Sequence, residues 1–389
     1  MTSALGRWWL TGVSLVAAGA LVAVSPDDAR GLLERLAPVL VFVVAMSIVV
    51  NTASDAGAFN AVASGLQRIR LPGLSVSAAT WARVVVLAVV STVFLSLDTT
   101  AIMVTPLAVA LARRAGVGMA GIGLAVVWIA NIASLLLPVS NLTNLLAVSG
   151  GAFTSTGDYL SMMWRPSLVA LAIAVLASWV VYRASGRRQS EADAEYDVAA
   201  VGDRNPRLRT SLIVLGCMLP LLVSPIPYWL TASVGALVLV VVSLREGGPG
   251  VAPASIPWRS LMFVVLLSST AAVLHSLGAT DWLACVLSGR GESSGGLLLI
   301  GGVGALLANL INNIPAFLAL ETAVGGHAGT AALLIGVNAG PIVTPWASLA
   351  TLLWHDQLRR NGVDVPWRGY VLAGCILMPV AVMAPILVI

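Results

Sequence analysis

The sequence predicts an all-α polytopic membrane protein made of two inverted repeats, each with a re-entrant hairpin and a broken transmembrane helix. Composition indicates the membrane class, because 58% of the residues are hydrophobic and only 10% are charged. A soluble domain carries about a quarter of its residues as charges. A polar motif that occurs once in each half predicts the repeats. We therefore expect a multi-pass protein of a bacterial-type cytoplasmic membrane.

Long apolar runs recur along the chain and predict roughly ten spans, since a span needs ~20 residues. The runs cover residues 8–24, 37–50, 84–96, 121–137, 168–181, 212–223, 230–242, 261–274, 297–310 and 370–389. A polar, Arg-containing linker at 186–208 separates an N-terminal repeat (1–185) from a C-terminal repeat (209–389). The positive-inside tendency predicts a cytoplasmic linker. About five spans precede it, and an odd number inverts the second repeat.

A polar motif surrounds a proline in each half. Asn131 stands seven residues before Pro138, and Asn338 stands seven residues before Pro345. Small hydroxyl and amide side chains follow the two prolines: Ser140, Asn141, Thr143 and Asn144 in the first half, and Ser348 and Thr351 in the second. Unpaired polar groups cost several kcal/mol in an apolar run. We therefore expect these residues to bind substrate at two discontinuous helices. The alternative is hydrogen bonding between closely packed helices.

A second pair of polar segments precedes this motif. Asp98, Thr99 and Thr100 begin one segment, and Asn312 and Asn313 begin the other. Each segment is about 15 residues long between a polar start and a polar end, which is too short for a span. We expect two re-entrant hairpins, the first with its tip at Thr99 and Thr100, and expect both asparagines to face substrate. Helix N-termini in such a pocket favour an anion or a hydroxyl-rich neutral solute.

Asp98 is the candidate residue for proton coupling. An ionised carboxylate in the membrane interior is costly, so such residues mark ion or proton pathways. Desolvation favours the protonated form of a carboxyl group, as a proton carrier needs. The alternative role is a helix cap that accepts hydrogen bonds from the Thr99 and Thr100 amides. One residue could serve both roles.

Four segments resemble a known family. They read LDTTAIMVTPLAVAL, ANIASLLLPVSNLTNLL, INNIPAFLAL and GVNAGPIVTPWASLATLLW. On these segments the chain is similar to the arsenical pump membrane protein (ArsB) family of arsenite and antimonite efflux permeases. That family belongs to the ion transporter superfamily, which also contains sodium-coupled di- and tricarboxylate carriers.

The resemblance implies inverted repeats, hairpins entering from opposite faces, and alternating access. It also implies coupling to the proton gradient, or to an arsenite-stimulated ATPase subunit where one is present, and the carboxylate-carrier branch implies a homodimer. The chain departs from the family at Asn131 and Asn338, where the pumps commonly carry Asp. Asp98 is retained. The carboxylate carriers have Ser-Asn-Thr where this chain reads Leu97-Asp98-Thr99, so we expect protons rather than sodium as the coupling ion.

We therefore expect a secondary transporter that exports arsenite or antimonite as a neutral hydroxide held by hydroxyls and amides, with no cofactor or metal. The alternative is transport of di- or tricarboxylates or another anion, coupled to protons or sodium. An intramembrane protease would need paired catalytic acids or H-E-x-x-H, and the sequence contains neither. A scaffold or channel subunit would not need two matched motifs. The arginines are scattered between spans, so nucleic-acid binding is not expected.

Overall fold

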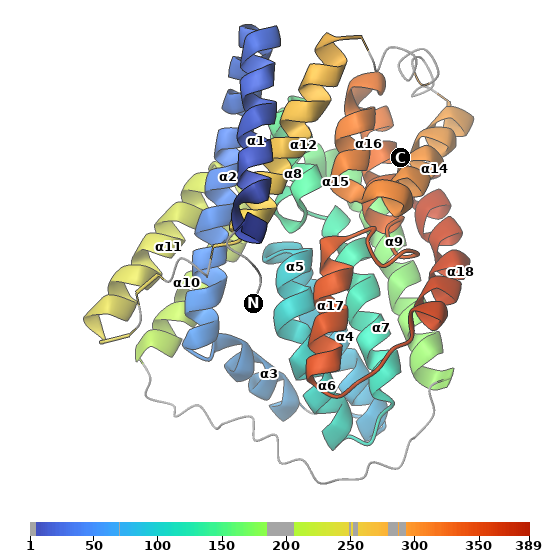
Figure 1. Cartoon of the computed structure of the whole chain (residues 1–389). Coiled ribbons are helices and arrows are strands. Elements are labelled where there is room, and N and C mark those ends of the chain that lie inside the picture. The colour runs from blue at the N-terminus through green and yellow to red at the C-terminus, as the bar shows by residue number, and fades with distance from the viewer. Residues whose placement is uncertain are drawn as a thin grey trace.

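The computed structural model describes residues 5–69, 71–184, 206–248, 250–251, 256–278, 287 and 293–389. Every regular element within these ranges is helical (Figure 1). The predicted linker falls outside the described residues except for its last three positions, 206–208.

Each of the ten predicted apolar runs coincides with a helix. In the first half the helices are α1 (Leu5–Val24), α2 (Pro26–Asp55), α3 (Ala58–Arg68), α4 (Val76–Phe94), α5 (Leu97–Thr99), a π-helical turn (Thr100–Val104), α6 (Thr105–Arg114), α7 (Met119–Ile132), α8 (Leu142–Ser149) and α9 (Thr156–Ala184). In the second half they are α10 (Pro206–Val223), α11 (Tyr228–Arg245), α12 (Trp258–Ser276), α14 (Ser294–Ile311), α15 (Asn313–Leu320), α16 (Gly326–Ala339), α17 (Leu349–Arg360) and α18 (Trp367–Ile386).

Eight of the described helices are long and apolar enough to cross a membrane: α2, α4, α9, α10, α11, α12, α14 and α18. Two shorter apolar helices cover Thr11–Val24 and Met119–Leu135. Together they account for the ten predicted runs, and the chain is an all-helical, multi-pass membrane protein.

Two of the predicted spans are arms of helical hairpins. The run at 84–96 lies in α4, which turns back through α5, the π-helical turn and α6. The run at 297–310 lies in α14, which turns back through α15. The predicted hairpins therefore contained only the returning arms. Hydropathy reports burial away from water and does not report whether an apolar helix continues across the membrane or turns back.

The helices form two groups (Figure 1). In one group α1 packs against α12, and α2 packs against α11, which also contacts α10. The other group contains both hairpins, α7, α8 and α9, and α16, α17 and α18. In Figure 1 the first hairpin opens toward the lower face and the second toward the upper face, so that α5 and α15 approach the middle of the molecule.

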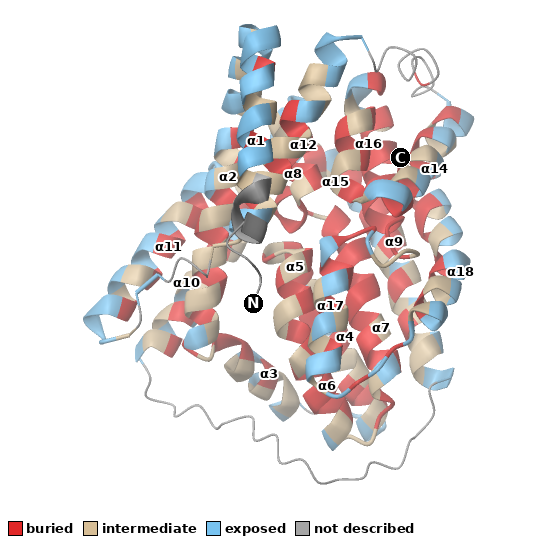
Figure 2. Ribbon diagram, in the orientation of Figure 1, coloured by how far each residue is buried: buried red, intermediate tan, exposed pale blue. Residues whose placement is uncertain are grey.

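Burial is concentrated where these elements meet (Figure 2). Nearly every residue of α7 and α16 is buried, and Trp128 and Trp354 are among the largest fully buried side chains. Large apolar side chains are exposed on the outer helices, for example Leu176 on α9, Leu237 on α11 and Ile376 on α18. An apolar exterior around a buried polar centre is the arrangement that a lipid environment requires.

Glycines allow α14 and α16 to approach closely. A Cβ atom at Gly336 would lie 2.2 Å from the carbonyl oxygen of Gly301, and one at Gly304 would lie 3.1 Å from the Leu333 side chain. Small residues at such crossings permit close backbone packing between membrane helices. This packing fixes the second hairpin against the second broken helix.

Candidate functional site

Two interrupted helices form the centre of the site. The first consists of α7 and α8, and residues 133–141 between them form short 3₁₀ turns around Pro138. Leu137 is extended (φ −122°, ψ 150°), as expected for a residue before proline. The second consists of α16 and α17, with Pro345 in the gap between them. Both prolines therefore lie in the breaks where the sequence predicts them.

The Asn338 side chain on α16 joins the second half of the chain to the first. Its Oδ1 accepts hydrogen bonds from Asn141 Nδ2 at 2.9 Å and from Thr143 Oγ1 at 2.7 Å. Its Nδ2 donates to Asn144 Oδ1 at 2.7 Å. All four side chains are at most 3% exposed. Four of the predicted site residues thus meet in one uncharged network, which we call the Asn338 network.

The Asn338 network also holds the first break in shape. Asn144 Nδ2 donates to the carbonyl oxygens of Ser134 and Leu137, at 2.7 and 3.1 Å. Asn141 caps α8 by accepting the Thr143 amide, and its Nδ2 also donates to Ser134 Oγ. These bonds satisfy carbonyl groups that the interrupted helix leaves without a helical partner. Hydrogen bonding between closely packed helices, the alternative role expected from the sequence, is therefore part of what Asn141 and Asn144 do.

Asn309 on α14 holds the second break, and the sequence reasoning missed it. Its Nδ2 donates to the Gly340 carbonyl at 2.8 Å, and its Oδ1 accepts the Val343 and Thr344 amides. Thr344 Oγ1 donates back to the Asn309 carbonyl at 2.7 Å. The available signal was an isolated amide in the apolar run of α14, which cannot stay unpaired in a membrane.

The hairpin tips have matching backbone geometry. Ser96 (φ 140°) and Asn312 (φ 93°) both have positive φ, which is uncommon for residues other than glycine. Each caps the returning arm: Ser96 Oγ accepts the Thr99 amide, and Asn312 Oδ1 accepts the Ile314 amide. The first tip therefore lies at Ser96, with Thr99 and Thr100 in the turn that follows it. Thr100 bonds within its own hairpin, to Thr92 and Ser96.

Each hairpin is hydrogen-bonded to the broken helix of its own half. In the first half Ser140 Oγ donates to the Val93 carbonyl at 2.7 Å. In the second half Asn312 Nδ2 donates to the Trp346 carbonyl, and the Asn313 amide donates to the Ala347 carbonyl, both at 2.9 Å. Ser140, Asn312 and Asn313 therefore contribute to the shape of the pocket through these bonds.

Asp98 lies on α5, directly after the first tip, and is half-buried. The predicted alternative role of Asp98 as the helix cap is wrong, because Ser96 makes the cap bond to the Thr99 amide. The segment that carries Asp98 packs against both α7 and α17. Asp98 therefore lies on a segment that contacts both broken helices, and it does not cap that segment.

Three further predicted residues, like Ser140, Asn312 and Asn313, lie outside the Asn338 network. Asn131 on α7 donates through Nδ2 to the Val127 carbonyl at 2.9 Å. Thr351 Oγ1 lies 3.3 Å from the Tyr370 hydroxyl on α18. Among the described residues, Asn131 Oδ1 and Ser348 Oγ are buried and have no hydrogen-bond partner.

Two buried tyrosines support the broken helices from α9 and α18. Tyr159 donates its hydroxyl proton to the Leu135 carbonyl at 2.6 Å, and Tyr370 bonds Thr351. Both are fully buried. Sequence reasoning missed them, although each is the fourth residue of the helix that follows a broken helix.

An ion pair links the two helix groups. The Arg35 guanidinium on α2 donates to both carboxylate oxygens of Glu321 and to the Leu146 carbonyl at the end of α8. Burial raises the pKa of the Glu321 carboxyl, and the charge and hydrogen bonds of Arg35 act in the opposite direction. The pair joins α2 to the end of the second hairpin and to the first broken helix.

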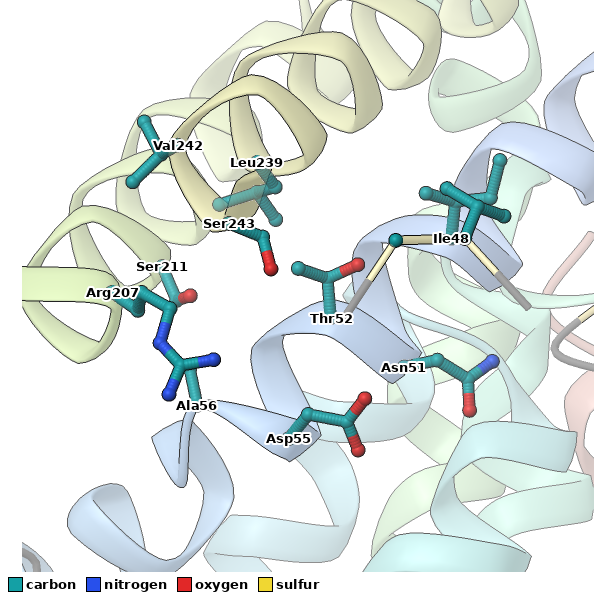
Figure 3. A pocket seen from close by; sticks show the side chains of 12 residues that line it. Ile48, Asn51, Thr52, Asp55, Ala56, Arg207, Ser211, Leu239, Val242 and Ser243 are labelled. Carbon is teal, nitrogen blue, oxygen red and sulfur yellow. The ribbon is translucent and has the colours of Figure 1, made fainter. Parts of the chain in front are cut away.

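A small polar pocket lies elsewhere, between the ends of α2, α10 and α11 (Figure 3). Asp55, Arg207 and the hydroxyl groups of Thr52 and Ser243 line it. Arg207 lies against the end of α11, where a Cβ atom on Gly248 would be 2.4 Å from its Nη1. None of the predicted site residues lines this pocket. Within the described ranges, no three His, Cys, Asp or Glu side chains are grouped as metal ligands would be.

Comparison with known proteins decides the family. A family model described as citrate transporter (CitMHS) matches residues 1–351. The chain belongs to the citrate transporter family. It is therefore a secondary transporter and not an enzyme, and the family implies a transported anion.

Arsenical pump membrane proteins are distant relatives of this chain. Those of Escherichia coli (strain K12) and Shigella flexneri are each 28% identical over 308 residues, which covers 72% of this chain and 70% of the relative. That of Yersinia enterocolitica is 27% identical over 307 residues, with the same coverage. The resemblance to the arsenical pumps within the ion transporter superfamily is thus confirmed.

The fold is also found in solved structures. The Alcanivorax borkumensis YdaH transporter superimposes with a TM-score of 0.60 and covers 100% of this chain and 88% of that chain. Its sequence identity is 14%, so the similarity concerns the fold alone.

Proposed function

We propose that this transporter of the citrate transporter family exports arsenite and antimonite across a bacterial cytoplasmic membrane in exchange for protons. The observation that carries the proposal is the polar centre where the two broken helices meet, in which the Asn338 network and its neighbours Asn131 and Ser348 present only amide and hydroxyl groups. Hydroxyl and amide groups suit a trivalent metalloid hydroxide, which is neutral near pH 7 and presents several O–H groups. The 28% identity to arsenical pumps supports the same substrate.

The proposed architecture is a pair of inverted repeats. In it α1 and α2 correspond to α11 and α12, the two hairpins and the two broken helices correspond to each other, and α9 corresponds to α18. An odd number of crossings (α1, α2, α7–α8, α9 and α10) separates α1 from α11, which inverts the second repeat. The matching tips at Ser96 and Asn312, and the matching pairs α1–α12 and α2–α11, support this arrangement.

In the proposed mechanism Asp98 carries the proton. An acid in the membrane interior is expensive unless it serves an ion pathway. Its protonation and deprotonation would bias the substrate site between inward-facing and outward-facing states. Such a shift requires that each state has a different affinity for the proton or for the substrate.

The second candidate function is transport of citrate or another di- or tricarboxylate, because the matching family model carries that description. Polyanions are bound by cationic side chains or by several convergent N–H groups. Within the described residues, the hydrogen bonds of the Asn338 network contain no Arg or His side chain. That composition favours the neutral substrate.

Arsenite accumulation in everted vesicles from cells that express this chain tests the proposal. We expect accumulation that a protonophore abolishes and that Asp98→Asn eliminates without lowering the Tm. Asp27→Asn, on the exposed first turn of α2, is the matched control and should transport normally. Accumulation of citrate in place of arsenite would overturn the metalloid assignment. Normal gradient-driven transport by Asp98→Asn would overturn the role of Asp98.

A further inference from the structure

Equivalent positions of the two broken helices are bonded differently. Asn131 and Asn338 each stand seven residues before the proline of their own half, and Asn141 and Ser348 each stand three residues after it. On one side the pair is closed, because Asn141 Nδ2 donates to Asn338 Oδ1 at 2.9 Å. On the other side the equivalent atoms, Ser348 Oγ and Asn131 Oδ1, are both without a partner among the described residues.

These two atoms are fully enclosed by protein. Asn131 is 0% exposed and Ser348 is 1% exposed. Leaving a buried polar atom unpaired is costly, and native structures leave few of them. The Asn131 amide cannot relieve this by rotation without loss of its bond from Nδ2 to the Val127 carbonyl. Serine is also shorter than asparagine, so Ser348 does not reproduce the contact that Asn141 makes.

The helices that carry the two residues pack side by side (Figure 1). The indole nitrogen of Trp354 on α17 donates to the Gly123 carbonyl on α7 at 2.8 Å and sets the register of this antiparallel pair. At 1.5 Å per residue, Asn131 lies about 12 Å along α7 from that bond, and Ser348 lies about 9 Å along α17 in the same direction. The two residues therefore lie on the same side of that bond, about 3 Å apart in depth by this count.

The first hairpin tip completes the surroundings. The segment that carries Asp98 packs against both α7 and α17. The three groups concerned are Asn131 Oδ1, the Asp98 carboxyl group and the Ser348 hydroxyl. Asn131 Oδ1 and an ionised Asp98 only accept hydrogen bonds, and the Ser348 hydroxyl can donate or accept. A ligand for this set must therefore bring its own O–H or N–H groups.

We infer that the substrate is held by the groups without a protein partner, Asn131 Oδ1 and Ser348 Oγ, together with Asp98, and that the Asn338 network instead holds the two broken helices in position. The inference rests on the proposed function and narrows it to one side of the site and one class of ligand. That class is a small neutral solute with several O–H donors. A polycarboxylate presents acceptor oxygens and would place them against acceptors.

Ligand-dependent thermal stabilisation of the purified full-length protein tests this assignment without transport. The probes are sodium arsenite at neutral pH and citrate. We expect arsenite to raise the Tm of the wild type, and expect Ser348→Ala and Asn131→Leu to raise the half-saturating arsenite concentration about tenfold. Ser268→Ala on α12 is the matched control, because its hydroxyl is also buried and has no partner among the described residues, and it should respond like the wild type.

The outcomes separate the inference from the proposed function. Unchanged arsenite half-saturation in Ser348→Ala, with a wild-type Tm in the absence of ligand, would overturn the inference. Stabilisation of the wild type by citrate and not by arsenite would overturn the ligand class. Arsenite binding that is weakened in Ser348→Ala, in a protein that does not export arsenite from cells, would support the inference and overturn the proposed function alone.

Discussion

At the scale of single residues, the polar centre is built from amides and hydroxyls that satisfy one another. Asn338 contributes most of this, because its amide is hydrogen-bonded to three side chains of the opposite half. The presence of an amide at this position has a physical consequence. An amide both donates and accepts hydrogen bonds. Asn338 can therefore donate to Asn144 Oδ1 and accept from the Thr143 hydroxyl at the same time, without taking up a proton.

The Thr143 hydroxyl provides a test of this network. Thr143→Val keeps the side-chain shape and removes the 2.7 Å bond to Asn338 Oδ1, so we expect a loss of about 1 kcal/mol in the free energy of unfolding. Thr105→Val is the matched control, since that threonine is equally buried but its hydroxyl has no partner among the described residues. The Tm of both variants in detergent is the measurement. Equal losses in the two variants would contradict a structural role for the Thr143 bond.

At the scale of elements, the broken helices keep their shape because asparagine side chains, from the broken helix itself or from a neighbouring helix, supply the missing hydrogen bonds. Asn309 of α14 closes the second break, and Asn144 of α8 closes the first. Each hairpin is held against the break of its own half by hydrogen bonds near its tip, between Ser140 and Val93 in the first half and between Asn312 and Trp346 in the second. We therefore expect each hairpin and the broken helix of its half to move as one unit during transport.

The crossing of α14 and α16 can be tested with glycine substitutions. A Cβ atom at Gly336 would lie 2.2 Å from the Gly301 carbonyl oxygen, so Gly336→Ala must push the helices apart. We expect a loss of about 2 kcal/mol, typical of overpacking. Gly302→Ala on α14 meets no atom within 4 Å and should be neutral or stabilising. Thermal unfolding of both variants is the measurement, and an unaffected Gly336→Ala protein would show that the helices are not in this close contact.

At the scale of the whole molecule, the proposed inverted repeat places the linker and the C-terminus on opposite faces. Figure 1 shows the end of α9 and the start of α10 at the lower face, and the C-terminus in the upper part of the molecule. If the linker is cytoplasmic, as the positive-inside tendency predicts, the C-terminus faces the other side of the membrane.

Accessible cysteines test this topology. In a background with Cys217, Cys285 and Cys375 replaced by Ser, we expect Ile389→Cys to react with a membrane-impermeant maleimide in intact cells. Ser190→Cys in the linker should react only after the membrane is permeabilised. Labelling of both positions under the same condition would place the linker and the C-terminus on one face and contradict the inverted arrangement.

The amino-acid sequence by itself determined that this is a helical membrane protein, where its apolar helices lie, and where two of them break. Hydropathy and proline act locally, so composition and spacing are sufficient for those conclusions. It also singled out Asn338 and Asn141 as polar residues that needed partners. The identity of the partners did not follow, because those bonds join residues from opposite halves of the chain.

Only the tertiary structure decided which apolar helices are hairpin arms, that Ser96 and not Asp98 caps the first tip, and that Asn309 closes the second break. It alone distinguished the closed pair of Asn338 and Asn141 from the open pair of Asn131 and Ser348. The physical reason is that a hydrogen bond in a membrane protein depends on side-chain length and helix register at the point of contact. Equivalent positions in the two halves can therefore be bonded on one side and free on the other.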